Sequence, residues 1–103
     1  MQLQDKIAVV TGAGRGMGRA MALGLAEAGA HLVLSDINAG SVEETSVEVK
    51  ALGRESLAVP SDMGNTDDID RMISQAKETF GKVDIMINNA GVTRYIYLSL
   101  IHI

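Results

Sequence analysis

The spacing of apolar positions changes from one segment of the 103-residue chain to the next. Short runs of consecutive apolar residues, typical of strands buried on both faces, occupy residues 6–11, 32–35, 56–59 and 83–87. The segments between them carry apolar residues at helical spacing. This alternation of strands and helices predicts an α/β fold with a parallel sheet and right-handed crossovers.

The first predicted helix covers residues 15–28, directly after the first strand. Ala20, Gly24 and Ala28 recur on one of its faces, so this face can pack closely on a sheet. Gly29 is expected to end the helix.

Local signals mark where the second and third helices begin and end. The sequence Ser-Val-Glu-Glu from Ser41 is a capping-box pattern that predicts the start of the second helix, which ends near Gly53. Asn65 or Thr66 is expected to cap the third helix, and Gly81 to end it. The third helix has an apolar face that is most simply a core face, formed by Ile69, Met72, Ile73, Ala76 and Phe80.

Composition excludes several classes of function. The formal net charge is −4, and no Lys/Arg cluster is present, which argues against a nucleic-acid partner. The absence of cysteine excludes disulfides and thiolate chemistry, and two isolated histidines, His31 and His102, make a metal site improbable. No apolar run is long enough to span a bilayer or to form a signal peptide, so we expect a cytoplasmic protein with no membrane partner.

The segment Thr-Gly-Ala-Gly-Arg-Gly-Met-Gly, residues 11–18, carries the strongest chemical signal. A glycine turn between a strand and a helix presents the unpaired N–H groups of the helix start to a phosphate. Gly12 allows the tight exit from the strand, Gly16 lets the backbone approach a pyrophosphate, and Gly18 lets the helix lie close on the sheet. Taken alone, such a string is equally compatible with a flexible turn.

Asp36 strengthens the phosphate-binding interpretation. It ends the second strand about 20 residues beyond the glycines, where an acidic residue hydrogen-bonds the ribose hydroxyls of a dinucleotide. The alternative is a solvated turn residue or helix cap, which the register with the glycines makes less favoured.

Taken together, the motifs resemble those of the classical short-chain dehydrogenases/reductases. The resemblance rests on the glycine turn, on Asp36, on Asp62 after the third strand, and on the Asn-Asn-Ala-Gly segment from Asn88 after the fourth. It covers residues 6–91. It implies a Rossmann-type doubly wound parallel sheet, which in this chain is truncated after the fourth strand.

The resemblance also implies a set of cofactor-binding residues. It places Asp62 at the adenine end of the cofactor, with a backbone contact from Met63, and it places Asn89, Ala90 and Gly91 along the adenosine ribose. The complete set of expected cofactor-binding residues is Gly12, Arg15, Gly16, Met17, Gly18, Asp36, Asp62, Met63, Asn89, Ala90 and Gly91.

Two of these residues bear on the choice between NAD and NADP. The Asp36 carboxylate accepts from both ribose hydroxyls and repels a 2′-phosphate, so it favours NAD. Arg15 points the other way, because relatives that use NADP often carry a basic residue there. We weight Asp36 more, since it meets the ribose directly, and expect NAD rather than NADP.

The activity implied by the resemblance is hydride transfer between the nicotinamide cofactor and a small carbonyl or alcohol substrate, in a homo-oligomeric parent enzyme. The family's catalytic serine, its Tyr-x-x-x-Lys pair and its supporting asparagine follow the Asn-Asn-Ala-Gly segment. No lysine follows Lys82 here, so no catalytic residue is assigned and the chain alone is expected to be inactive. A cluster of Ser99, Tyr97 and His102 is rejected, because a short terminal peptide cannot preorganise such groups.

Two alternatives remain. The first is a nucleotide-binding module or fragment without catalysis. The second is a methyltransferase that binds S-adenosylmethionine on a related sheet, which ranks last because Thr11 stands where that class has an acidic residue.

The end of the chain differs in character from the rest. We expect residues 1–92 to form the N-terminal part of a dinucleotide-binding Rossmann domain and residues 93–103 to be a non-native or irregular tail. Residues 98–103 are what the transposon end CTGTCTCTTATACACATC encodes, and a natural frameshift or splice tail is the other origin considered. We therefore expect them to carry no function.

Overall fold

The computed structural model describes residues 2–62 and 65–89, and the backbone of residues 95–98. Strands and helices alternate through the first two of these ranges, as the apolar pattern predicts. The elements, in chain order, are β1 (Ile7–Thr11), α1 (Gly16–Glu27), β2 (His31–Asp36), α2 (Ala39–Ala51), β3 (Ser56–Pro60), α3 (Thr66–Phe80), β4 (Ile85–Asn88) and β5 (Tyr95–Leu98).

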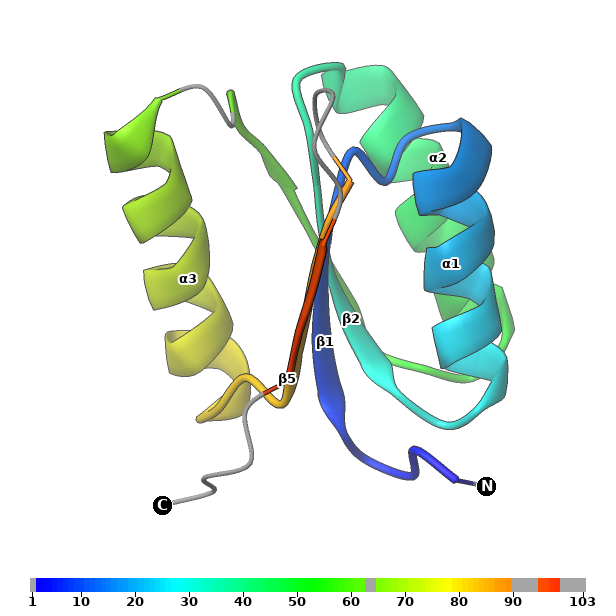
Figure 1. The fold of residues 1–103 in the computed structure, drawn as a ribbon. Coiled ribbons are helices and arrows are strands. Elements are labelled where there is room, and N and C mark those ends of the chain that lie inside the picture. The colour runs from blue at the N-terminus through cyan, green and yellow to red at the C-terminus, as the bar shows by residue number, and fades with distance from the viewer. Residues whose placement is uncertain (1, 63–64, 90–94, 99–103) are drawn as a thin grey trace.

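The strands form one sheet in the order β3-β2-β1-β4-β5. The first four are parallel, with Val9 of β1 opposite Val33 of β2 and Met86 of β4. Helices α1 and α2 cover one face of the sheet, and α3 covers the other (Figure 1). This is the doubly wound Rossmann-type arrangement, and the predicted parallel sheet is confirmed.

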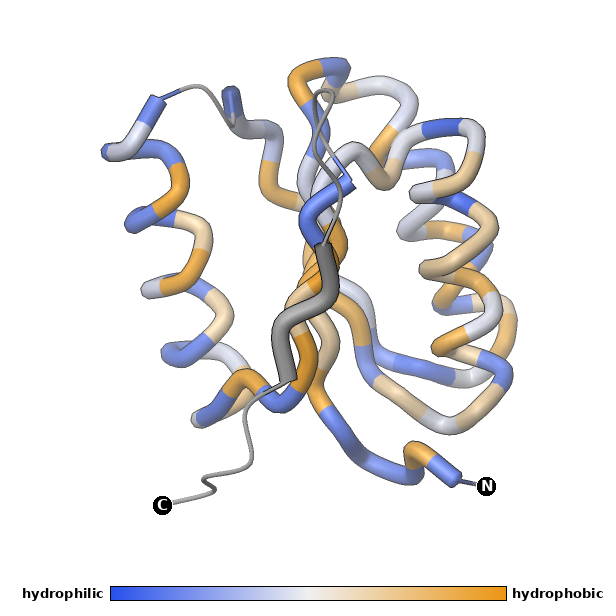
Figure 2. Tube along the Cα trace, in the orientation of Figure 1, coloured by the Kyte–Doolittle hydropathy of each residue, from blue (hydrophilic) through white to orange (hydrophobic). Residues whose placement is uncertain are grey.

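Each face of the sheet has its own hydrophobic core, because successive side chains of a strand point to opposite faces. Ala8, Val10 and Leu32 pack under α1 and α2, whereas Val9 and Val33 pack under α3. Figure 2 shows the hydrophobic colour concentrated in the central strands, with hydrophilic positions on the outward sides of the helices. Burial on both faces explains why the strands are near-continuous apolar runs.

Strand β5 differs from the expectation of a sheet that stops at the fourth strand and an irregular tail. It pairs antiparallel with the outer edge of β4, with Ile96 opposite Ile87. An unpaired strand edge exposes N–H and C=O groups, and a nearby segment rich in β-branched and aromatic residues can satisfy them. The short connection from β4 permits only an antiparallel return. The division of the chain at residue 92 stays a prediction.

The start of α2 also corrects the sequence analysis. The predicted capping box at Ser41 is wrong, because Asn38 caps the helix and its side chain accepts a hydrogen bond from the Ser41 N–H at 3.0 Å. The predicted cap of α3 is confirmed at Asn65, whose side chain accepts from the N–H groups of Asp67 and Asp68. Any of several Asn and Ser residues can cap a helix locally, so the tertiary position of the chain decides between them.

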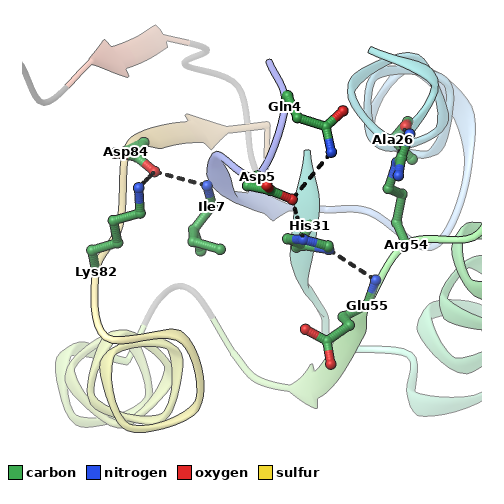
Figure 3. Close-up of polar contacts among 9 residues, drawn as sticks. All are labelled: Gln4, Asp5, Ile7, Ala26, His31, Arg54, Glu55, Lys82 and Asp84. Carbon is green, nitrogen blue, oxygen red and sulfur yellow. Dashed lines mark hydrogen bonds and ion pairs between the residues drawn. The ribbon is translucent and has the colours of Figure 1, made fainter. Parts of the chain in front are cut away.

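Polar contacts join the amino ends of the strands (Figure 3). Nδ1 of His31 accepts a hydrogen bond from the N–H of Glu55 at 3.0 Å, and Nε2 lies 3.2 Å from Oδ1 of Asp5. The His31 ring stacks on Phe80 with centroids 6.2 Å apart, and Arg54 Nε donates to the carbonyl of Ala26 at 3.1 Å. His31 therefore joins the starts of β2 and β3 to the end of α3.

Asp84 performs the same role for β1 and β4. Its side chain is only 2% exposed, and Oδ2 accepts the N–H of Ile7 at 2.9 Å and lies 3.2 Å from Nζ of Lys82 (Figure 3). The N–H of Asp84 donates to the Ile7 carbonyl at 2.9 Å, so the two strand starts are held by reciprocal bonds. Strand β4 begins at Ile85, two residues later than predicted, because Asp84 is used in this link.

Substitution of Asp84 tests this link. Asp84→Ala should lower the free energy of unfolding by about 2–4 kcal/mol, because it leaves a buried backbone N–H and a nearby ammonium without their acceptor. Lys82→Gln is the matched control and should cost less than about 1 kcal/mol, since Lys82 is 42% exposed. Urea titrations of the two variants measure the difference, and equal losses would contradict the assignment.

Candidate functional site

The glycine turn between β1 and α1 has a backbone that two of its glycines make possible. Gly12 has a φ of 61° and Gly16 a φ of 59°, in the left-handed region that other residues rarely adopt. A Cβ built on Gly16 would meet no atom within 4 Å, so this part of the turn faces open space. A ligand can therefore approach the backbone of Gly16 closely.

Gly18 serves the packing of α1 rather than its conformation. A Cβ at this position would lie 2.0 Å from the carbonyl oxygen of Gly12 and 2.8 Å from Nδ2 of Asn89. Neither contact is possible for real atoms. Only glycine lets the first turn of α1 lie directly against the end of β1 and the end of β4.

The start of α1 differs from the starts of α2 and α3. Arg15 occupies the cap position without a side-chain hydrogen bond, and the first turn holds no acidic residue. Helices α2 and α3 begin instead with the capping side chains of Asn38 and Asn65. The first-turn N–H groups of a helix have no partner within the helix, and its dipole places positive charge there. The start of α1 is therefore suited to an anion.

The carboxylate of Asp36 lies beside this turn. Oδ2 accepts the N–H of Gly14 at 2.9 Å, and Oδ1 accepts the N–H of Asn38 at 3.1 Å. The carbonyl of Asp36 accepts the N–H of Ser61 at 3.0 Å, which brings the end of β3 to the same edge of the sheet. The side chain is partly exposed and fixed in orientation.

Thr11 joins the turn to the end of β4. Its hydroxyl donates to Oδ1 of Asn88 at 2.8 Å and accepts the N–H of Asn89 at 2.9 Å. Thr11 itself is fully buried, and its Asn partners are half-buried. The Asn-Asn segment is thereby held at the same edge as the glycines.

The structure brings most of the expected cofactor residues to one edge, the carboxyl ends of the parallel strands. Gly14 links Asp36 to the glycine turn, Thr11 links Asn89 to it, and Asp62 directly follows Ser61 at the end of β3. The side chain of Asp62 is exposed, and its N–H donates to Oδ2 of Asp68 at 2.8 Å. Met63, Ala90 and Gly91 lie outside the described residues. The assignment of the whole set to a cofactor stays a prediction.

The expected cofactor-binding set leaves out four residues of this edge: Thr11, Gly14, Ile37 and Asn88. Val10 pairs with Ile87, so the next residues along, Thr11 and Asn88, stand side by side, a register that sequence alone does not give. Ile37 directly follows Asp36 and is 75% exposed. Met17 in the turn is 53% exposed.

One ion pair joins the two helices that cover the same face of the sheet. Arg19 pairs with Glu48 across α1 and α2, with Nε donating to Oε1 at 3.1 Å, and this hydrogen bond raises the pKa of the Arg19 guanidinium. In the part of the chain that the structure describes, no three His, Asp or Glu side chains gather to hold a metal ion.

No helix among those same residues has the length and apolarity needed to cross a membrane.

The chain belongs to the short chain dehydrogenase family, whose pattern matches residues 6–100. It is 45% identical over 92 residues to 2-dehydro-3-deoxy-D-gluconate 5-dehydrogenase of Escherichia coli, covering 89% of this chain and 36% of that protein. Among solved structures, it is similar to a hydroxysteroid dehydrogenase from Escherichia coli, with a TM-score of 0.85, 38% identity, and coverage of 88% of this chain and 39% of the other.

A second similar structure is a short chain dehydrogenase/reductase from Burkholderia phymatum in complex with NAD. Its TM-score is 0.80 at 37% identity, with coverage of 84% of this chain and 31% of that one. The chain thus spans well under half the length of these relatives.

Alanine substitutions in α1 test the close approach at Gly18. Gly18→Ala should lower the free energy of unfolding by at least about 2–3 kcal/mol, because α1 must move away from the Gly12 carbonyl. The prediction that Ala20, Gly24 and Ala28 form the sheet-facing side of this helix is wrong, because its buried residues are Gly18, Ala22 and Ala26. Gly24→Ala, on the exposed side and with nothing within 4 Å of its Cβ, should raise the free energy of unfolding by up to about 1 kcal/mol. Denaturant titration measures both, and a tolerated Gly18→Ala would refute the packing argument.

Proposed function

We propose that this chain is the cofactor-binding part of an oxidoreductase that transfers a hydride between NAD and a carbonyl or alcohol carbon of a small substrate. The observation that carries the proposal is the Asp36 carboxylate, held 2.9 Å from the N–H of Gly14 beside the uncapped start of α1. One edge of the sheet thus offers an anion site and a ribose acceptor together. The E. coli and B. phymatum relatives, named as dehydrogenases, support the reaction class.

Different residues at the carboxyl edge bind different parts of the dinucleotide. The open backbone at Gly16 and the start of α1 bind the pyrophosphate, and Asp36 accepts hydrogen bonds from the adenosine ribose. Asp62 lies at the adenine end of the cofactor, and the exposed side chain of Ile37 offers the adenine ring an apolar surface. When bound, the nicotinamide supplies the hydride acceptor or donor, and the chain's part is to bind and orient it.

Asp36 also favours NAD over NADP. Its carboxylate accepts from ribose hydroxyls but repels a 2′-phosphate, whose charge it would face at hydrogen-bond distance. Arg15 is exposed at the cap of α1 and is the one residue of the set that favours NADP. The fixed orientation of Asp36 supports giving it the greater weight.

Replacing Asp36 tests this preference. The wild-type chain should bind NADH at least about tenfold more tightly than NADPH, and Asp36→Ala should bring the two dissociation constants within a few-fold, because the acceptor and the repulsion are lost together. Fluorescence titration of the reduced cofactors measures both constants. Asp70→Ala removes the same charge from the exposed face of α3 and should leave the ratio unchanged. Tighter binding of NADPH than of NADH by the wild-type chain would contradict the proposed preference for NAD.

A second candidate function is nucleotide binding without catalysis, which needs only the uncapped start of α1 and the Asp36 carboxylate. We expect the 103-residue chain to bind the dinucleotide but not to oxidise or reduce a substrate, because no acid/base pair is supplied to the nicotinamide. Turnover is measured as the loss of NADH absorbance after carbonyl substrates are added to the chain. Turnover abolished by substitution of Tyr95 or Tyr97 would contradict this expectation.

Further parts of the proposal follow from the family. The catalytic serine, tyrosine and lysine belong to a longer parent enzyme, which we propose to be cytoplasmic and homo-oligomeric. Its substrate is a small carbonyl or alcohol compound. The net charge of −4 supports the absence of a nucleic-acid partner.

A further inference from the structure

Gly14 lies in the glycine turn without any of the roles given to the other glycines. Its backbone does not adopt a positive φ, so its conformation does not require glycine. Its surroundings do, because a Cβ there would lie 2.6 Å from Cβ of Ser41, 2.8 Å from Oδ2 of Asp36 and 3.2 Å from Cγ of Asp36. The glycine is therefore needed for the close approach of the Asp36 carboxylate and of α2.

We propose that Gly14 is a positioning residue that sets the orientation of the Asp36 carboxylate, and with it the discrimination between a 2′-hydroxyl and a 2′-phosphate on the adenosine ribose. This inference rests on the proposed function, since it concerns the same ribose site. It adds a residue whose substitution alters specificity without itself carrying a charge or a side chain.

Two backbone donors hold the carboxylate from opposite sides. The N–H of Gly14 comes from the turn after β1, and the N–H of Asn38 comes from the start of α2, so each oxygen of Asp36 accepts one bond. A carboxylate oxygen has two acceptor positions, and one on each oxygen is therefore available to a ligand hydroxyl. A charge held in this way cannot turn aside to admit a phosphate without breaking a charge-assisted hydrogen bond.

The structure also indicates which neighbour would move if residue 14 carried a Cβ. Cβ of Ser41 is fixed to the backbone of α2, whose first turn is held by the Asn38 cap. The Asp36 carboxylate ends a side chain with rotatable bonds and is partly exposed. The clash with Asp36 is therefore relieved by rotation of the carboxylate, which loses the Gly14 N–H as it moves, whereas the clash with Ser41 requires a shift of the turn or of α2.

The test compares ADP-ribose with 2′-phospho-ADP-ribose, two probes that differ only at the 2′ position and lack nicotinamide. Their dissociation constants from the 103-residue chain are measured by calorimetry, and the ratio of the two is the readout. Gly14→Ala should reduce the wild-type preference for ADP-ribose about tenfold, as expected for one weakened charge-assisted bond and a displaced charge. A general loss of folding would weaken both probes alike and leave the ratio unchanged.

Two further variants separate the contacts at residue 14. The double variant Gly14→Ala with Ser41→Gly removes the clash with α2 but keeps the clash with Asp36, so its ratio should still fall. Gly40→Ala is the matched control, because its Cβ would meet only Oδ1 of Asn38 at an ordinary 3.5 Å, and it should keep the wild-type ratio. In an Asp36→Ala background, Gly14→Ala should leave the ratio as it is, because the group it positions is absent.

The outcomes separate the two proposals. A wild-type chain that binds neither probe contradicts the proposed function itself. A wild-type chain that prefers ADP-ribose, with the same preference in Gly14→Ala and in the double variant, overturns the role of Gly14 and leaves the proposed function standing. The inference is supported if Gly14→Ala and the double variant both reduce the preference for ADP-ribose, and if Gly14→Ala has no effect on this preference when Asp36 is already replaced by Ala.

Discussion

The contact between the start of α1 and the end of β1 is the constraint on which the site depends. The space for a Cβ at Gly18 is taken by the Gly12 carbonyl, 2.0 Å away, so helix and strand touch through their backbones. This contact aims the first-turn N–H groups of α1 past the edge of the sheet. Without it, the start of α1 would stand away from Asp36 and Asn89, and no single ligand could reach all three.

The two edges of the sheet have different tasks. At the amino edge, His31 accepts the N–H of Glu55 and Asp84 accepts the N–H of Ile7, and these bonds hold the strand starts in register. At the carboxyl edge, Asp36 is held by two backbone N–H groups yet keeps acceptor capacity toward solvent. In open α/β sheets ligands bind at the carboxyl ends of the strands, and this division of polar groups gives that rule a local physical cause.

The apolar pattern alone predicted four strands and three helices, because burial on both faces leaves a strong sequence signature. Local geometry was less accessible: Asn38 rather than Ser41 caps α2, and the pairing of β5 depended on a free edge that sequence does not display. The turn and Asp36 could be identified by type and spacing. The role of Gly14 could not, since it arises from a contact with Asp36, 22 residues further along the chain.

The proposed function requires that a dinucleotide binds at the carboxyl edge, between the glycine turn and Asp36. Titration of the ¹⁵N-labelled chain with NADH, followed through backbone amide shifts, tests this binding site. The amides of Gly14, Gly16 and Asn38 should shift together with one dissociation constant, while those of His31 and Asp84 at the opposite edge should not shift. Shifts confined to the amino edge, or no shift at either edge at saturating NADH, would contradict it.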